Sequence, residues 1–229
     1  MISVYSMRMP HNAAYHTKDD RKAGIALIAG SLGGLLAMHI HPRGAATIND
    51  EAQAAHLAIT SAAAHSLALV SMLLLFLGAC GLAHRLNRDD RISFIAIVTY
   101  AFASVAVLIA AAVSGFVVPA ILTHMIHDTG VNARQWQIVI SGIFQINQGM
   151  AQIFSISSSA AILLWSIAAL RNRGLNSALA IYGCIAGLVI IVAVPAGLRL
   201  NVQGMAIVML AQAFWFISAG VQMSRGAPE

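Results

Sequence analysis

The sequence contains little charge. Asp, Glu, Lys and Arg make up 9% of its 229 residues, whereas an ordinary soluble domain carries about 25%. The charges stand in short clusters between long apolar runs, and none occupies the middle of a run. Transporters that couple to protons or sodium through a membrane carboxylate need such a residue, and a retinal protein needs a buried lysine. Both classes are therefore disfavoured.

Cysteines and the common catalytic motifs are also scarce. The two cysteines, Cys80 and Cys184, make no metal-binding spacing, so we expect both to be small core residues. No G-x-S-x-G elbow, P-loop or glycine-rich nucleotide fingerprint occurs. Nucleophilic catalysis is unsupported as well, because the serines at 157–159 have no acidic residue in their apolar run. The sequence leaves open whether the protein is an enzyme.

Hydrophobic residues, by contrast, make up 59% of the chain, and the mean hydropathy is +0.80. They form six apolar runs, and a helix that crosses a bilayer takes roughly 20 residues. The sequence therefore predicts an all-α polytopic membrane protein, a bundle of six transmembrane helices in contact with the lipid bilayer. The predicted spans are about 23–41, 53–84, 92–124, 133–170, 176–198 and 202–223.

The distribution of Lys and Arg predicts the orientation of this bundle. With six spans, ten of the thirteen basic residues fall on the side of the two termini and three on the other side. The positive-inside rule places the basic side in the cytoplasm. We therefore expect a cytoplasmic segment 1–22, a membrane domain 23–224 and a cytoplasmic tail 225–229, in the inner membrane of a bacterium.

Two further expectations follow from the same charges. The sequence pI of about 9.8 reflects membrane topology, and no basic stripe interleaved with aromatic residues indicates a nucleic-acid partner. The polar segment before the first apolar run is unlike the start of a cleavable signal peptide. We expect the first run to remain as an anchor helix.

Five of the nine histidines fall on the outer side of this topology, at the ends of the first three spans: His39, His41, His56, His124 and His127. His124 and His127 share a helix face, and Pro42 disfavours helix just before it, which would let His39 and His41 converge. Neutral imidazoles suit Zn(II) or Cu(II), and the thioethers of Met38 and Met125 would favour Cu(I). The alternative is that these are ordinary interfacial side chains with polar tips.

His65 lies in the same span as His56, nine residues and roughly 13 Å deeper. A histidine at that depth should face the interior of the bundle and have a partner. The functional interpretations are an axial ligand of haem b, a proton relay or a substrate contact. The structural alternative is a neutral histidine that is hydrogen-bonded to a neighbouring helix.

The fourth span carries a polar stripe with the period of a helix. Its steps of three and four residues place all its members on one face. An amide stripe facing lipid would be costly, so we expect this face to line a cavity or to contact other helices. The predicted substrate-binding residues are Gln145, Gln148 and Gln152, with Gln212 of the sixth span as a partner. The whole stripe comprises Gln137, Ser141, Gln145, Gln148, Gln152, Ser155 and Ser159.

Two resemblances accompany this pattern. The segment "AHSLALVSMLLLFLGACGLAHRL" (64–86) makes the layout similar to small six-span bacterial membrane proteins. The membrane histidines resemble those of multihelical b-type cytochromes, which place paired histidines on facing helices at matching depth. By sequence, only His65 lies deep, without a depth partner.

Three hypotheses remain. The protein binds a metal ion (Cu or Zn) or haem, in a redox role; it facilitates movement of a small neutral solute through a Gln- and Ser-lined cavity; or it is a structural subunit. In the last case its partner would be a second copy of the chain or another membrane protein.

Overall fold

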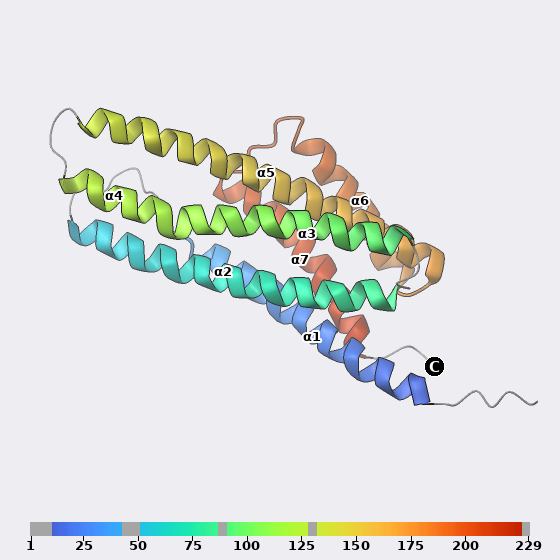
Figure 1. Cartoon of the computed structure of the whole chain (residues 1–229). Coiled ribbons are helices and arrows are strands. Elements are labelled where there is room, and N and C mark those ends of the chain that lie inside the picture. Colours follow the sequence, from blue (N-terminus) through green and yellow to red (C-terminus); the bar gives the residue numbers. More distant parts are fainter. Residues whose placement is uncertain (1–10, 43–50, 87–90, 128–131, 226–229) are drawn as a thin grey trace, which may run out of the picture.

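The structure, a computed structural model, describes residues 11–42, 51–86, 91–127 and 132–225 (Figure 1). Within these ranges the regular structure is entirely helical and includes no strand, so the all-α prediction is confirmed. The helices are α1 (His11–His39), α2 (Glu51–Arg85), α3 (Arg91–Ala112), a π turn (Val113–Val117), α4 (Val118–His127), α5 (Asn132–Asn172), α6 (Ser177–Ala193) and α7 (Val202–Ser224).

In the described part of the chain, five helices are long and apolar enough to cross a membrane: Lys18–His39, Glu51–Arg85, Arg91–Met125, Gln135–Asn172 and Val202–Ser224. These are the helices of a multi-pass membrane protein. The sixth apolar helix, α6, is shorter, with 17 residues. It ends at Ala193, before the predicted limit at 198. Pro195 cannot donate a helical hydrogen bond, and Gly197 takes a positive φ of 106° in the turn that follows.

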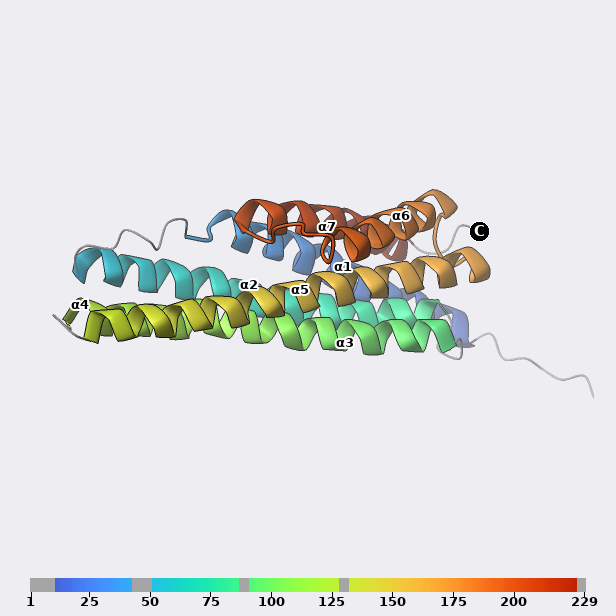
Figure 2. The same ribbon diagram turned by 90° about the horizontal axis from the view of Figure 1, so that it is seen from above.

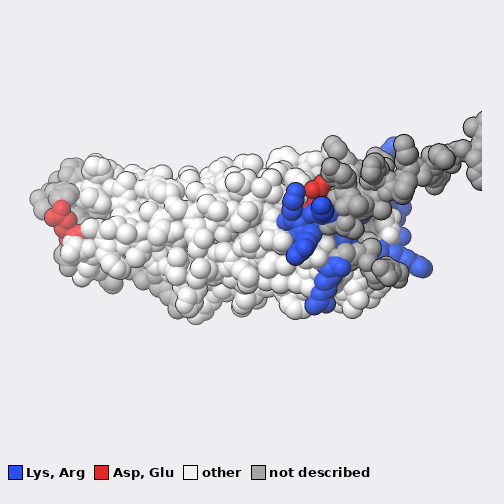
Figure 3. All heavy atoms as spheres, turned by 90° about the horizontal axis from the view of Figure 1, so that it is seen from below, with Lys and Arg blue, Asp and Glu red and all other residues white. Residues whose placement is uncertain are grey.

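Charge is concentrated at one end of the bundle (Figure 3). At this basic end Arg85 donates hydrogen bonds to Asp20 at 3.2 Å and to the Gly174 carbonyl at 3.2 Å. The Asn172 amide donates to the Leu86 carbonyl at 2.9 Å. These contacts tie the ends of α1, α2 and α5 together. We call the opposite end, where α1 ends and α2 and α5 begin, the histidine end.

The helices differ in length, and the difference appears at the histidine end (Figures 1 and 2). With 35 and 41 residues, α2 and α5 extend about 50–60 Å, whereas the 17 residues of α6 extend about 26 Å. Therefore α2, α5 and α4, which continues α3 beyond the π turn, project beyond α1, α6 and α7. A hydrocarbon layer is about 30 Å thick, so α2, α5 and the continuous helix Arg91–Met125 must tilt or project beyond it.

Glycines bring α1 close to two neighbouring helices. A methyl group added at Gly24 would lie 2.5 Å from the Gly220 carbonyl oxygen of α7. On the other side of α1, a methyl group added at Gly78 of α2 would lie 2.8 Å from the Leu27 backbone nitrogen. Small residues allow such close backbone approach in membrane helix pairs. They hold α1 between α2 and α7.

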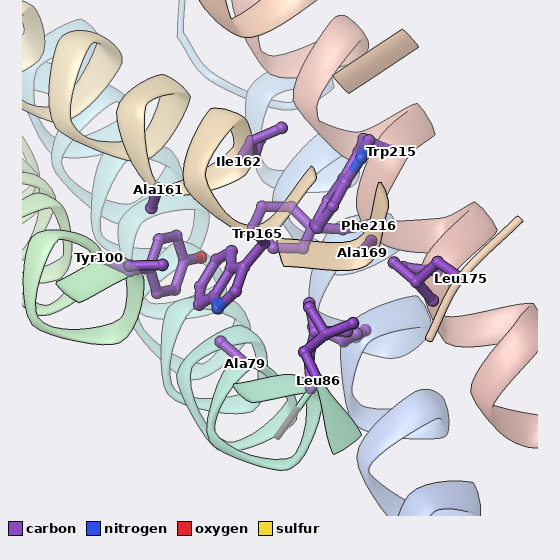
Figure 4. Packing of buried hydrophobic residues seen from close by; sticks show 14 of the residues in the cluster. Ala79, Leu86, Tyr100, Ala161, Ile162, Trp165, Ala169, Leu175, Trp215 and Phe216 are labelled. Atoms are coloured by element: carbon purple, nitrogen blue, oxygen red, sulfur yellow. The ribbon is translucent and has the colours of Figure 1, made fainter. Parts of the chain in front are cut away.

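The basic half of the bundle is filled by a cluster of aromatic side chains (Figure 4). Tyr100 of α3 packs against Trp165 of α5, with ring centres 5.5 Å apart, and Trp165 stacks on Trp215 of α7 at 6.2 Å. Phe216 contacts Tyr100 as well, at 5.5 Å. All four are buried. These rings pack against one another in the interior of this half.

Replacing Gly24 with Ala should destabilise the fold, because the added methyl group meets the Gly220 carbonyl rather than a flexible side chain. The expected loss is about 1–3 kcal/mol, seen as a lower midpoint of thermal unfolding in detergent. Gly34→Ala on the same helix is the matched control. Its methyl group would lie 3.6 Å from the Met209 methyl, so its midpoint should stay or rise. Equal midpoints for the two variants would contradict the close crossing.

Candidate functional site: a histidine-lined cavity

A cavity of about 330 Å³ lies where α1 ends and α7 begins, against the middle of α2 and α5. Its volume is near the lower limit for small-molecule sites, about 300–1,000 Å³. His41 and His65 line it. A second depression of about 720 Å³ adjoins it and shares Met38 and Pro42 with it.

His41 reaches the cavity because α1 has already ended. The helix stops at His39, and residues 40–41 form a bend before Pro42, as expected where a proline disfavours helix in the residue before it. The His41 Nδ1 atom lies 3.0 Å from the Pro42 carbonyl oxygen. Since a carbonyl can only accept, Nδ1 carries a proton, and in the neutral ring Nε2 holds the lone pair.

His65 is buried in α2 and has the same tautomer. Its Nδ1 donates to the Ser61 carbonyl at 2.7 Å, which leaves Nε2 as the unprotonated nitrogen. The centres of the His41 and His65 rings lie 5.0 Å apart, with the ring planes at 66°. Two imidazole rings, each with its Nδ1 held by a backbone carbonyl, therefore meet at one cavity.

A proline on the facing helix explains how Ser61 is placed. In the π turn the Val118 N–H donates to the carbonyl five residues earlier, that of Val113. The next bond of this series would run from residue 119 to the Ser114 carbonyl, but Pro119 has no N–H. The Ser61 hydroxyl donates to that carbonyl instead, at 3.0 Å. This is how a membrane helix tolerates proline: a serine and a π adjustment satisfy the freed group.

Gly115 in the same turn lets α2 come close. A methyl group added there would lie 2.5 Å from the His65 Cβ atom. A π turn inside an α-helix often accompanies a functional site. Here it sets both the spacing between the helices and the position of the His65 ring.

The rest of the cavity wall combines thioethers and neutral amides. Met38, Met205 and Met209 contribute thioether side chains, and Asn147 and Gln148 contribute amides. The Met205 sulfur also accepts a hydrogen bond from the Ser155 hydroxyl at 3.8 Å. Within the described residues the Asn147 Oδ1 atom is buried without a hydrogen-bond partner. No carboxylate lines the cavity in the described part of the chain. The wall therefore offers soft and neutral ligands only.

The five outer histidines predicted as metal ligands are not gathered at this cavity. His39 lines the adjoining depression, His56 is exposed, and His124 stacks on Trp136 with ring centres 6.2 Å apart. The His127 side chain lies outside the described residues. Among the described residues no three His, Cys, Asp or Glu side chains lie close enough to share a metal ion. The pair that does form joins His41 to the deep His65.

Residues of the polar stripe of α5 are exposed, line the cavity or pack against α7. Gln145 and Gln152 are exposed, against the expectation that the whole stripe faces inward, while Gln148 lines the cavity. Gln212 is buried, and its amide donates to the Ser158 and Ser159 hydroxyls at 2.7 and 2.9 Å. The inner part of the stripe is thus a packing contact between α5 and α7.

Comparison with protein families, curated proteins and solved structures finds no match for this chain.

Ser61→Ala should lower the free energy of unfolding by about 1 kcal/mol, the range of hydrogen bonds between membrane helices, because the Ser114 carbonyl would lose its donor. The same substitution should cost less in a Pro119→Ala background, where residue 119 regains an N–H for that carbonyl. A double-mutant cycle in detergent measures the coupling. Strictly additive effects would contradict the proposed link between Pro119 and Ser61.

Proposed function

We propose that this membrane protein binds one copper(I) ion between His41 and His65. The observation that carries the proposal is the pairing itself: both Nδ1 atoms are tied to backbone carbonyls and the rings lie 5.0 Å apart. Metal-binding histidines characteristically hold the second ring nitrogen in this way, which fixes the tautomer and orients the ligating nitrogen.

The distance between the rings supports a shared ion rather than a haem. Two imidazoles on one trigonal or tetrahedral ion have their ring centres roughly 5 Å apart, because each ligating nitrogen lies about 2 Å from the metal. Two axial ligands on opposite sides of a haem iron would be roughly 6 Å apart, with the porphyrin between them. The 5.0 Å separation and the 330 Å³ cavity favour the smaller ligand.

The chemistry of the wall favours Cu(I) over Zn(II) or Cu(II). Thioethers and imidazoles suit Cu(I), and Met38, Met205 and Met209 line the same cavity as the two histidines. No described cavity residue supplies the negative charge that would offset a divalent ion in an apolar bundle. The same ligand set stabilises the reduced ion, so the proposal concerns binding of Cu(I) and not a redox cycle.

The placement in the membrane completes the proposal. Six membrane helices, α6 included, with both termini and the basic end in the cytoplasm, would put the cavity near the outer surface of a bacterial inner membrane. The positive-inside rule supports this orientation. The 17 residues of α6 reach about 26 Å, close to the hydrocarbon thickness. Copper would then reach the site from outside the cytoplasm.

A second candidate, a facilitator for a small neutral solute, is supported by Asn147 and Gln148 at the cavity. Toward the basic end, however, the amide of Gln212 is engaged by two serine hydroxyls, and the aromatic cluster fills the bundle. This favours a binding pocket over a path through the membrane.

The purified protein should bind one equivalent of Cu(I) under reducing, oxygen-free conditions, measured by competition with a coloured Cu(I) chelator. His41→Ala and His65→Ala should each weaken binding at least about tenfold, since loss of even a supporting contact costs 10–100-fold at metal sites. X-ray absorption of the loaded protein should show nitrogen and sulfur ligands.

His56→Ala and His124→Ala are the matched controls, because both side chains are exposed and lie away from the pair. Their affinity should stay unchanged. Equal losses for all four variants would indicate adventitious binding, and failure of the wild-type protein to compete with the chelator would reject the copper site.

A further inference from the structure

The depression of about 720 Å³ that adjoins the histidine-lined cavity has a metal-binding composition of its own. It lies between the last turn of α1 and the first turns of α7, and His39 and Gln203 line it. A metal site needs an entry path as well as ligands, and this depression borders the cavity that holds His41 and His65. Four residues line both spaces: Met38, Pro42, Asn201 and Val202.

The end of α1 places two histidines at the two spaces. His39 is the last residue of the helix and lines the depression, whereas His41 lies beyond the helix end and lines the cavity. Ile40 between them is 42% exposed. Two residues of chain extend at most about 7 Å, so the Cα atoms of His39 and His41 are no farther apart than that. One imidazole therefore stands outside the pair, within a short step of it.

Met38 and His39 are the soft ligands of the depression. The Asn201 side-chain oxygen, also at its wall, is already engaged, because it accepts a hydrogen bond from the Gly204 N–H at 2.9 Å and caps α7. No carboxylate lines the depression in the described part of the chain. One imidazole and one thioether suit Cu(I), but the cavity offers two imidazoles and three thioethers. An ion in the depression would be held more weakly and would move inward.

We propose that the depression is the entrance through which Cu(I) reaches the His41 and His65 pair, with His39 as the first ligand and Met38 as the next. The inference rests on the proposed copper site. Cu(I) favours soft ligands and passes between them by exchange, in which a new bond to the ion forms as an old one breaks. The His39 nitrogen displaces a ligand of the incoming complex, and Met38, which borders both spaces, transfers the ion to the pair. The ion remains Cu(I), and neither an electron nor a proton is transferred.

An entrance ligand affects rates and leaves the equilibrium unchanged. A residue that binds the ion only during passage lowers the same barrier for entry and for exit. Its loss therefore slows uptake and release by the same factor, and the dissociation constant stays the same. Loss of a residue that ligates or supports the bound ion weakens the affinity instead. The two roles are thus separable by experiment.

Stopped-flow transfer of Cu(I) from a coloured chelator to the purified full chain, without oxygen, tests the entrance. His39→Ala should slow uptake and release at least several-fold and leave the equilibrium affinity unchanged. His39→Met should restore fast uptake, because a thioether also ligates Cu(I), whereas His39→Gln, which keeps only a polar amide, should not. His56→Ala is the matched control, because His56 is exposed and lines neither space. Its rates should equal those of the wild type.

The outcomes separate the entrance from the copper site. If the wild-type protein takes up Cu(I) and His39→Ala does so at the same rate, the entrance role is overturned while the copper site stands. A weaker affinity in His39→Ala would make His39 a ligand or support of the bound ion, and equal slowing in His56→Ala would show a general effect of surface histidines; either result also overturns the proposal. A wild-type protein that takes no Cu(I) from the chelator rejects the copper site and the entrance together.

Discussion

Inside an apolar bundle every backbone carbonyl needs a hydrogen-bond donor, and the histidine end depends on one carbonyl that lacks its own. Pro119 cannot continue the π turn to the Ser114 carbonyl, and the Ser61 hydroxyl from α2 takes that place. The contact sets the rotation of α2 against the facing helix. Because the Ser61 carbonyl also accepts from His65, the same rotation directs the imidazole at the cavity. The site therefore follows from the way one proline is accommodated.

The unequal lengths of the helices divide the bundle into two halves with different properties. Near the basic end every described helix except α4 is present, and Trp165, Trp215 and Tyr100 lie buried in the interior. Toward the histidine end α1 and α6 stop while α2 and α5 continue. The interior there is filled incompletely, which creates the cavity.

The sequence predicted the site only in part. The first span was predicted to reach residue 41, with Pro42 favouring an unwound helix at His39 and His41, whereas α1 ends at His39. The depth of His65 indicated an inward-facing histidine with a partner. The contact between His41 and His65 was not predictable, because His41 lies just beyond the end of α1 and its position depends on how that end packs against α2. The sequence predicts that the whole amide stripe of α5 faces inward. The helix period shows which residues share a face, but it does not show how far along that face a neighbouring helix extends. Gln212 is buried against serines while Gln145 is exposed.

What the sequence by itself determined is the class of protein: long apolar runs without charge must form helices, because in lipid a helix satisfies its backbone within one segment. The concentration of basic residues at one end of the bundle was also predictable from the sequence. Only the tertiary structure decided which polar side chains meet. Which side chains meet depends on the rotation of each helix, on the close contacts of α1 at its glycines and on the Ser114 carbonyl left without a donor by Pro119. Each of these is a contact between segments that are far apart in the sequence, so the sequence pattern does not predict it.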